Sequence, residues 1–213
     1  MSVENICKEL HQLFNALPKQ VYPFDFTNIP NNGIYILFEQ GELSHGVDRI
    51  VRIGTHTGSN QLRSRIKQHF IKENKDRSIF RKNIGRCILN QSGSQFSEDW
   101  NKDLTTKKNR DLYESEIDSV VQAELEKQVT QYMQEYFSLV FFKVNDKERR
   151  LELESKIIST VCLCEECKPS ANWLGNKSPL EKIKNSGLWQ VQELYNKPFT
   201  EAEFETFQLD CFV

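Results

Sequence analysis

The sequence predicts an α+β fold in which a small antiparallel β-sheet is flanked by helices. Residues 33–39 and 49–54 form two short apolar runs close together in the chain, as the paired strands of a hairpin do. The run "FSLVFFKV" at 137–144 is rich in β-branched and aromatic residues and predicts a further strand. Strand-like and helical segments do not alternate regularly, which favours the α+β class over α/β.

Apolar residues at helical spacing mark the helices that we expect between and around these strands. The expected helices cover residues 2–17, 59–72, about 75–85, 115–136, 147–162 and 178–187, with a cap-like pattern at Thr200. Ser178 and Gly187 are residue types that begin and end a helix. We expect a loop for "QGELSHGVD", a short strand after Gly85, and a long loop or insertion over 90–112.

The composition indicates a soluble globular protein. The chain has 213 residues, of which 38% are hydrophobic and 27% are charged. No apolar run approaches the ~20 residues that cross a bilayer, and the N-terminal stretch lacks the pattern of a secretory signal. Six cysteines in such a chain are expected as reduced thiols. We therefore expect a cytoplasmic protein with no membrane partner.

Basic residues are concentrated in one part of a chain whose net charge is −2. Residues 49–86 hold eleven Lys/Arg and only two Asp/Glu, whereas the remainder of the chain is acidic. A basic block on an acidic body is typical of a surface that meets a polyanion. A solvated helix face held by salt bridges is the alternative interpretation.

The helix expected over 59–72 carries two chargeable side chains beside its apolar stripe. Leu62, Ile66 and Phe70 define that stripe at spacings of four residues. On a helical projection, Arg65 and His69 lie next to the stripe, one turn apart, rather than on the solvent side. They either cover the border of the core or point together at one anionic ligand.

The helix expected over 147–162 places a carboxylate within its apolar stripe. Leu151, Ile158 and Val161 lie on one side of this helix, and Glu154 projects among them. Burying a carboxylate without a partner is strongly unfavourable. Glu154 is therefore expected to join a salt bridge or to bind a hard divalent cation such as Mg²⁺.

Short motifs follow one another in a recognisable order along the chain. They are Gly33-Ile34-Tyr35, Val51-Arg52-Ile53-Gly54, Arg65 with His69, Glu154 before Ile157 and Ile158, and Pro169 with Asn172. With these motifs in this order, the chain resembles GIY-YIG nucleases over about residues 31–175. Arg52 stands where that family usually has a tyrosine, and some restriction endonucleases of the family look similar in having a basic side chain there.

The resemblance implies a division of the chain into three segments. Residues 1–30 would form an N-terminal helical extension. Residues 31–175 would form the nuclease domain, with an insertion at about 90–136. Residues 176–213 would form a C-terminal helical extension packed on the core. The insertion would carry the long helix that precedes the third expected strand.

The resemblance also implies a divalent-metal-dependent DNA endonuclease that hydrolyses phosphodiester bonds. Glu154 would hold Mg²⁺ or Mn²⁺, and Arg65 and Arg52 would bind the phosphate. Either Tyr35 or His69 would take the proton from the attacking water, since both residue types can serve as a general base when their pKa is suitable.

Further polar residues would bind the DNA. Asn172 would orient the nucleophile or anchor a phosphate. Contacts to the backbone of double-stranded DNA, which carry no sequence information, are expected from Arg63, Lys67, Lys72, Arg77, Arg81, Lys82 and His56. A restriction-like enzyme would cut a short duplex sequence as a homodimer, whereas a structure-specific enzyme would prefer a junction or a flap.

Two features leave alternatives open. Arg52 stays protonated and cannot act as a general base, so a catalytically inactive DNA-binding module is the alternative function. Separately, Cys162, Cys164 and Cys167 lie close together in "CLCEECK", and Cys87 could add a fourth ligand. Because a zinc site usually has two clear pairs of ligands, we interpret this cluster as the end of a helix.

Overall fold

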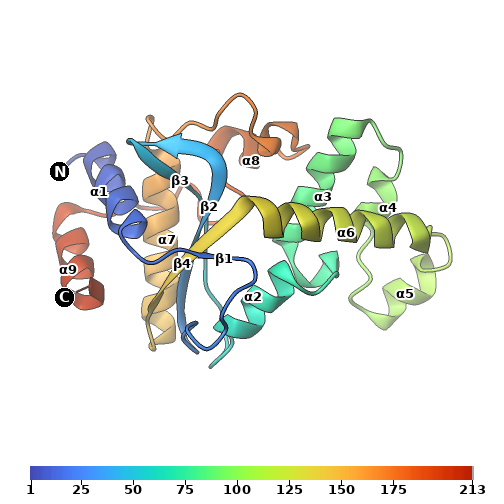
Figure 1. Cartoon of the computed structure of the whole chain (residues 1–213), viewed down its shortest axis with the longest axis horizontal. Helices are drawn as coiled ribbons and strands as arrows, with labels where there is room; N and C mark the ends of the chain where they lie inside the picture. The colour runs from blue at the N-terminus through green and yellow to red at the C-terminus, as the bar shows by residue number, and fades with distance from the viewer. Residues whose placement is uncertain (213) are drawn as a thin grey trace.

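A four-stranded antiparallel sheet forms the centre of the protein in a computed structural model that describes residues 1–212. The strands are β1 (Gln20–Val21), β2 (Gly33–Ser44), β3 (Val47–Gly54) and β4 (Phe137–Lys143). Their order in the sheet is β1-β4-β2-β3, and each neighbouring pair is antiparallel (Figure 1). The expected α+β class is confirmed, and β3 lies at one edge of the sheet.

Helices enclose this sheet (Figure 1). Their bounds are α1 (Val3–Asn15), α2 (Leu62–Phe70), η1 (Lys75–Arg77), α3 (Ile79–Ser92), α4 (Ser97–Asn101), α5 (Lys107–Tyr113), α6 (Ser119–Tyr136), α7 (Lys147–Leu163), η2 (Leu174–Lys177), α8 (Glu181–Ser186) and α9 (Glu201–Phe212). Within residues 1–212, no helix combines the length and the apolar character that crossing a bilayer requires.

The sheet separates two hydrophobic cores. Residues of α1, α7 and α9 pack on one face, and residues of α2, α3 and α6 pack on the other (Figure 1). Along β2, Ile34 and Ile36 enter the first core, whereas Tyr35 and Leu37 enter the second. This is the alternation of side chains that a strand covered on both faces requires. It directs Tyr35 to the side of the sheet on which α2 lies.

A β-bulge interrupts the pairing of β2 with β3. Leu37 pairs with Arg52 and Phe38 pairs with Ile50, so that Val51 has no partner on β2. A bulge adds one residue to one strand and allows two successive side chains to share a face. Val51 accordingly enters the second core, and the guanidinium of Arg52 lies 4.8 Å from the ring centre of Phe80 on the same side.

Most of the expected elements are confirmed. The strand over 137–144 is present, as are the helices over 2–17, 115–136 and 147–162, with ends that differ by a few residues. The cap at Thr200 is also present, because its hydroxyl accepts a hydrogen bond from the Glu203 amide, and the Glu203 carboxylate accepts one from the Thr200 amide.

Three local expectations are wrong. The segment "QGELSHGVD" is not a loop, because β2 continues to Ser44 and β3 begins at Val47. Gly85 does not end a helix, since α3 runs on to Ser92 and no strand follows it. The Trp100 ring occupies the space above Gly85, where a Cβ would lie 2.3 Å from it. The 90–112 stretch contains α4 and α5 rather than a plain loop.

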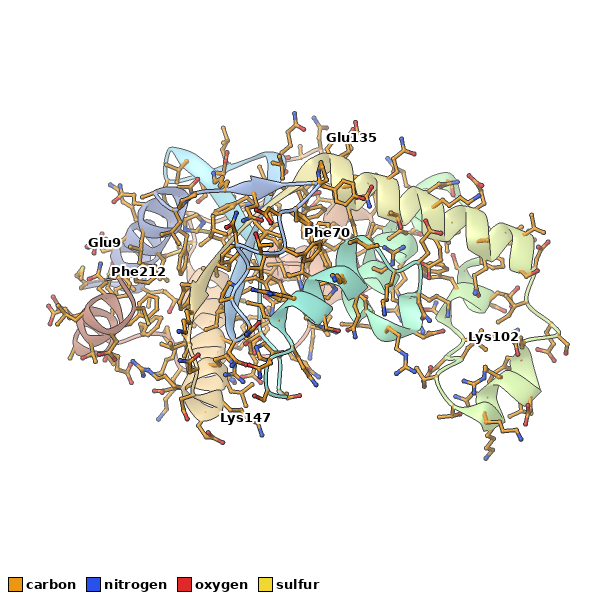
Figure 2. The ribbon with its side chains drawn as sticks, turned by 60° about the horizontal axis from the view of Figure 1, so that its bottom comes forward. Glu9, Phe70, Lys102, Glu135, Lys147 and Phe212 are labelled. Carbon is orange, nitrogen blue, oxygen red and sulfur yellow. The ribbon has the colours of Figure 1, made fainter. Side chains whose placement is uncertain are left out.

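Helices α4 and α5 lie far from the helices at the two ends of the chain. Figure 1 shows α4 and α5 on one side of the molecule and α1 and α9 on the other. Figure 2 shows the same arrangement from a different side, with Lys102 at one end and Glu9 and Phe212 at the opposite end. The central sheet lies between these two groups of helices (Figure 1).

Candidate active site

Two adjoining cavities lie beyond the end of β3, between α2 and α7. Their volumes are about 380 Å³ and about 580 Å³. Both are lined by Thr57, Arg65, Leu151 and Glu154, so they form one continuous opening. Arg65 comes from α2 and Glu154 comes from α7, which pack against opposite faces of the sheet. The opening is therefore lined from both layers.

Glu154 faces the opening from the first half of α7 and is half-buried. One of its carboxylate oxygens accepts a hydrogen bond from the Thr55 amide at 3.0 Å. Burial raises the pKa of Glu154, and the positive charge of Arg52 opposes that rise. The salt bridges of α7 within residues 1–212 use Arg149 and Lys156 and do not reach Glu154. The carboxylate therefore keeps free coordination capacity toward the opening.

Arg65 contributes positive charge on the opposite wall. Its guanidinium donates hydrogen bonds to the side-chain oxygen of Gln68 and to the backbone carbonyl of Arg77, both at 3.3 Å. Within residues 1–212, no carboxylate lies at salt-bridge distance from Arg65 or Arg52. Arg65 and Arg52 thus approach the same opening as Glu154. Two guanidinium groups at one opening can bind the negatively charged oxygens of a phosphate.

A chain of buried hydrogen bonds runs behind the opening. The Tyr35 hydroxyl lies 2.9 Å from Nε2 of His69, and Nδ1 of His69 lies 2.7 Å from Oγ of Ser78. Burial, reinforced by the charges of neighbouring arginines, holds the pKa of His69 well below its usual value. The imidazole is therefore neutral near pH 7, and one of its two nitrogens accepts a hydrogen bond.

Arg52 links this buried chain to the opening. Its Nε donates to the Tyr35 hydroxyl at 3.4 Å, and its guanidinium also donates to the backbone carbonyl of Trp189. The next residue of that segment, Gln190, accepts a hydrogen bond from the Ile53 amide at 3.0 Å. The segment after α8 therefore fixes the edge of β3 and orients Arg52, which lines the second cavity.

Two glycines of the opening motifs are required by close approaches. A Cβ at Gly54 would lie 2.2 Å from the Tyr35 hydroxyl, because the phenol ring crosses β3 at this residue. A Cβ at Gly33 would lie 2.2 Å from the carbonyl oxygen of Phe142 on β4. The absence of a side chain at Gly54 thus allows Tyr35 to reach His69. This explains why a tyrosine on β2 is paired with a glycine on β3.

His56 follows β3 and lines the first cavity. Its Nδ1 lies 2.7 Å from the carbonyl oxygen of Gly58, so Nδ1 carries the proton and donates it. Its Nε2 is buried and has no hydrogen-bond partner within residues 1–212. Burial lowers the pKa of His56. His56 therefore holds a buried, unprotonated nitrogen in a side chain that lines the same cavity as Arg65 and Glu154.

The structure does not bring Asn172 to this opening, which corrects the expectation for that residue. Asn172 is exposed and lines neither cavity. The turn that carries it is held elsewhere, since the amide and hydroxyl of Ser170 donate to the Glu42 carboxylate at 3.0 and 2.5 Å. No local signal in the sequence announces this long-range contact.

Arg81 and Lys82 are also not where a DNA contact requires them. Arg81 is 0% exposed and forms a salt bridge with Glu126 at 2.6 Å. Lys82 is buried and its ammonium lies 3.2 Å from the Asp76 carboxylate. A charge that is buried and already paired is unavailable to a phosphate, so both residues are corrected to a structural role.

The other expected DNA contacts lie along α2 and η1. Lys67, Lys72 and Arg77 are exposed. Arg63 is half-buried and donates to the carbonyl of Ile29 at 2.6 Å. An exposed basic surface, which we define as Lys67, Lys72 and Arg77, therefore borders the helix that carries Arg65.

Sequence reasoning missed several residues that shape the opening. Thr55 binds Glu154, Trp189 and Gln190 fix the β3 edge, and the buried side chain of Asn83 lines the second cavity. None of them has a distinctive local pattern. Only the polar ending of "SGLWQ" after an apolar pair could have suggested that the segment reaches a polar site.

In the part of the chain that the structure describes, a carboxylate without a basic partner lies opposite two arginines without acidic partners, an arrangement suited to binding a phosphate ester. A family model described as the GIY-YIG domain matches residues 7–211, and the chain belongs to that family. The domain points to an endonuclease, for which DNA is the substrate. No curated protein and no solved structure matches the chain.

Proposed function

We propose that this protein is a divalent-metal-dependent endonuclease that hydrolyses phosphodiester bonds of double-stranded DNA. The observation that supports it is the opening beyond β3, where, among residues 1–212, Glu154 has no basic partner at salt-bridge distance and Arg52 and Arg65 have no acidic one. These groups are complementary to a metal-bound phosphate. The buried chain behind them supplies groups that can hold a proton.

Glu154 is the residue that would hold the metal ion. Its free carboxylate oxygen faces a polar opening, and Mg²⁺ takes one or two protein carboxylates together with water and phosphate oxygens. The residues present therefore fit a hard divalent cation, Mg²⁺ or Mn²⁺. When bound, such an ion polarises the phosphate and stabilises the leaving 3′ oxygen.

Arg65 and Arg52 would bind the non-bridging oxygens of the phosphate. Both are held in place before substrate arrives, Arg65 by Gln68 and the Arg77 carbonyl, Arg52 by the Trp189 carbonyl. Preorganised donors stabilise charge that develops in a transition state without having to reorient. Removing one such donor typically lowers kcat by about 10²–10³.

The proton of the attacking water would pass to Tyr35 and His69. If the Tyr35 oxygen takes the water's proton as its own proton moves to Nε2 of His69, the hydroxyl is regenerated and His69 becomes the cation. The 2.9 Å contact between these atoms supports this relay. His56 is the second candidate acceptor, because its Nε2 is unprotonated and has no partner within residues 1–212.

Cleavage of supercoiled plasmid with Mg²⁺ or Mn²⁺ tests the proposal. We expect the wild type to cut, and Glu154→Ala and Arg65→Ala to lose at least about 10² in rate while remaining folded. Glu152→Ala is the matched control, since it removes an exposed carboxylate from the same helix. Fixed fragments would identify a restriction-like enzyme, whereas cutting confined to junctions or flaps would identify a structure-specific one.

The same assay examines the alternative of an inactive DNA-binding module. If no substrate is cut with either metal although the protein binds DNA tightly, Arg52 marks a lost active site. The proposed homodimer is tested separately. A restriction-like enzyme needs two copies in order to cut both strands, and sedimentation of the DNA complex measures how many copies bind.

A further inference from the structure

A cluster of side chains that could bind a metal lies on the face of the sheet covered by α1, α7 and α9. Cys7 comes from α1, His45 from the turn between β2 and β3, and Cys167 from the segment after α7. Their ligand atoms, together with those of His11, all lie within 4.8 Å of one another. Cys164 adjoins this group, with its sulfur 3.5 Å from Nε2 of His45. None of these residues lines the active-site opening.

The distances in this cluster match the edges of a tetrahedron around one ion. The Cys7 and Cys167 sulfurs are 3.3 Å apart, and the Cys167 sulfur is 3.3 Å from Nε2 of His45. Zinc with bonds of about 2.3 Å to sulfur and about 2.0 Å to nitrogen requires edges of roughly 3.5–3.8 Å. Shifts of a few tenths of an ångström would open the cluster for the ion.

The His45 ring is already oriented as a metal ligand. Its Nδ1 lies 3.2 Å from the Glu166 carboxylate, which is an acceptor for the Nδ1 proton. Its Nε2 is thereby left unprotonated and faces the sulfurs of Cys164 and Cys167. A carboxylate behind the imidazole is the usual support of a zinc-bound histidine. His45 also has a φ of 52°, a conformation uncommon for a residue other than glycine.

His11 lies next to the cluster, but its nitrogens are occupied. Its Nε2 accepts a hydrogen bond from the Ile50 amide at 3.1 Å, and its Nδ1 lies 2.9 Å from the Cys7 carbonyl oxygen. Coordination through Nε2 would leave the buried amide of Ile50 without an acceptor. Within residues 1–212, the hydrogen-bond partner of the Cys164 sulfur is Nε2 of His45, itself a member of the cluster, so coordination through Cys164 leaves no backbone amide without an acceptor.

We propose that Cys7, His45, Cys164 and Cys167 bind one structural zinc ion. Three thiolates and one imidazole select a soft or borderline metal such as zinc over Mg²⁺, so the site is separate from the proposed nuclease centre. All four side chains are buried, which leaves no open position for a substrate. The ion would tie α1, the β2–β3 turn and the end of α7 together.

The test is the zinc content of the full chain after reconstitution with Zn²⁺ under reducing conditions and removal of unbound metal. We expect one ion per chain for the wild type and for Glu154→Ala. Cys164→Ser should lose the ion, whereas Cys162→Ser should keep it, which makes the latter a matched control from the same segment. Replacement by Co²⁺ should give the visible spectrum of tetrahedral cobalt bound to thiolates.

Variants of the two neighbouring glutamates keep the proposal testable if the cysteine variants do not fold. Glu166→Gln removes an exposed carboxylate and should weaken zinc affinity by about 10–100-fold in a chelator competition. Glu165→Gln, also exposed, should leave the affinity unchanged. Equal affinities for the two variants would overturn the proposal. So would a reconstituted wild type without zinc, or a disulfide between Cys7 and Cys167.

Discussion

At the scale of single residues, the close contact between Gly54 and Tyr35 determines where the Tyr35 hydroxyl lies in the site. Gly54→Ala would place a Cβ 2.2 Å from the Tyr35 hydroxyl, and the ring is buried on all sides. We expect a loss of about 1–3 kcal/mol in the free energy of unfolding and a large loss of cleavage, because the Tyr35–His69 contact must open. Urea denaturation and the plasmid assay measure the two effects. Unchanged stability and activity would contradict this account of the motif.

The proton acceptor can be identified from the pH dependence of kcat/KM. Loss of a general base lowers the rate by about 10²–10⁴ and removes the limb on which the rate rises with pH. We expect this result for Tyr35→Phe and His69→Gln, and a much smaller effect for His56→Asn. A large loss of rate for His56→Asn, with small losses for Tyr35→Phe and His69→Gln, would assign the role of general base to His56.

The pKa of His69 makes stability depend on pH. Burial holds its folded-state pKa well below the ordinary value of 6.5, so the unfolded chain binds the extra proton first as the pH falls. The free energy of unfolding should therefore decrease below about pH 6.5, through the folded pKa, and be independent of this group at higher pH. Urea unfolding between about pH 5 and pH 8 should show a shallower decrease for His69→Gln. An equal decrease would assign the effect to other groups.

At the scale of elements, a buried ion pair attaches α6 to α3. The guanidinium of Arg81 on α3 binds the carboxylate and the carbonyl of Glu126 on α6, at 2.6 and 2.9 Å. Glu126→Ala would leave Arg81 buried without a counter-charge, which typically costs about 3–5 kcal/mol. Glu124→Ala, an exposed position of the same helix, should cost little. Thermal unfolding of the two variants compares them directly, and equal losses would contradict this interpretation.

Elements with a strong local period were predictable, whereas those fixed by distant partners were not. The stripes of α2 and α7 located Arg65, His69 and Glu154 beside apolar residues, as the structure has them. The segment "QGELSHGVD" was expected to be a loop, although Glu42 lies in the part of it that continues β2. Glu42 is buried against Arg49, with its oxygen 2.6 Å from the guanidinium. No property of the local sequence reveals that partner.

The same distinction applies to the site. Trp189 and Gln190 contact the β3 edge from a segment more than a hundred residues away, and no local motif marks either one. Asn172 was expected at the site from the resemblance, through its match with Pro169 to the last motif, and a contact between Ser170 and Glu42 holds its turn elsewhere. Long-range contacts therefore explain both why Trp189 and Gln190 reach the site and why Asn172 does not.

At the scale of the whole molecule, much of the basic charge in residues 49–86 is neutralised internally. Buried salt bridges pair Arg49 with Glu42, Arg81 with Glu126, and both Lys75 and Lys82 with Asp76. The surface available to DNA is therefore smaller than the composition indicates. It consists chiefly of the exposed basic surface along α2 and η1, together with the arginines of the opening.

Salt dependence of DNA affinity should distinguish surface charges from buried ones. Each phosphate contact contributes about −0.9 to the slope of log K against log salt concentration. Replacing Lys67, Lys72 and Arg77 together by glutamine should reduce the magnitude of the slope by about 3. Lys82→Gln should leave the slope unchanged, because its charge faces Asp76. Binding is measured in the Glu154→Ala background to prevent cutting, and equal slopes for all proteins would exclude this surface.

The contact between Arg52 and the Trp189 carbonyl also determines how late in synthesis the proposed centre can be completed. The two residues are separated by 137 positions, and synthesis at about 5–20 residues per second takes on the order of ten seconds to cover that distance. During that interval the emerging polypeptide holds its tyrosine, its histidine and both arginines without the group that orients Arg52. An unfinished translation product that ends before Trp189 therefore lacks the carbonyl that holds Arg52 at the proposed centre.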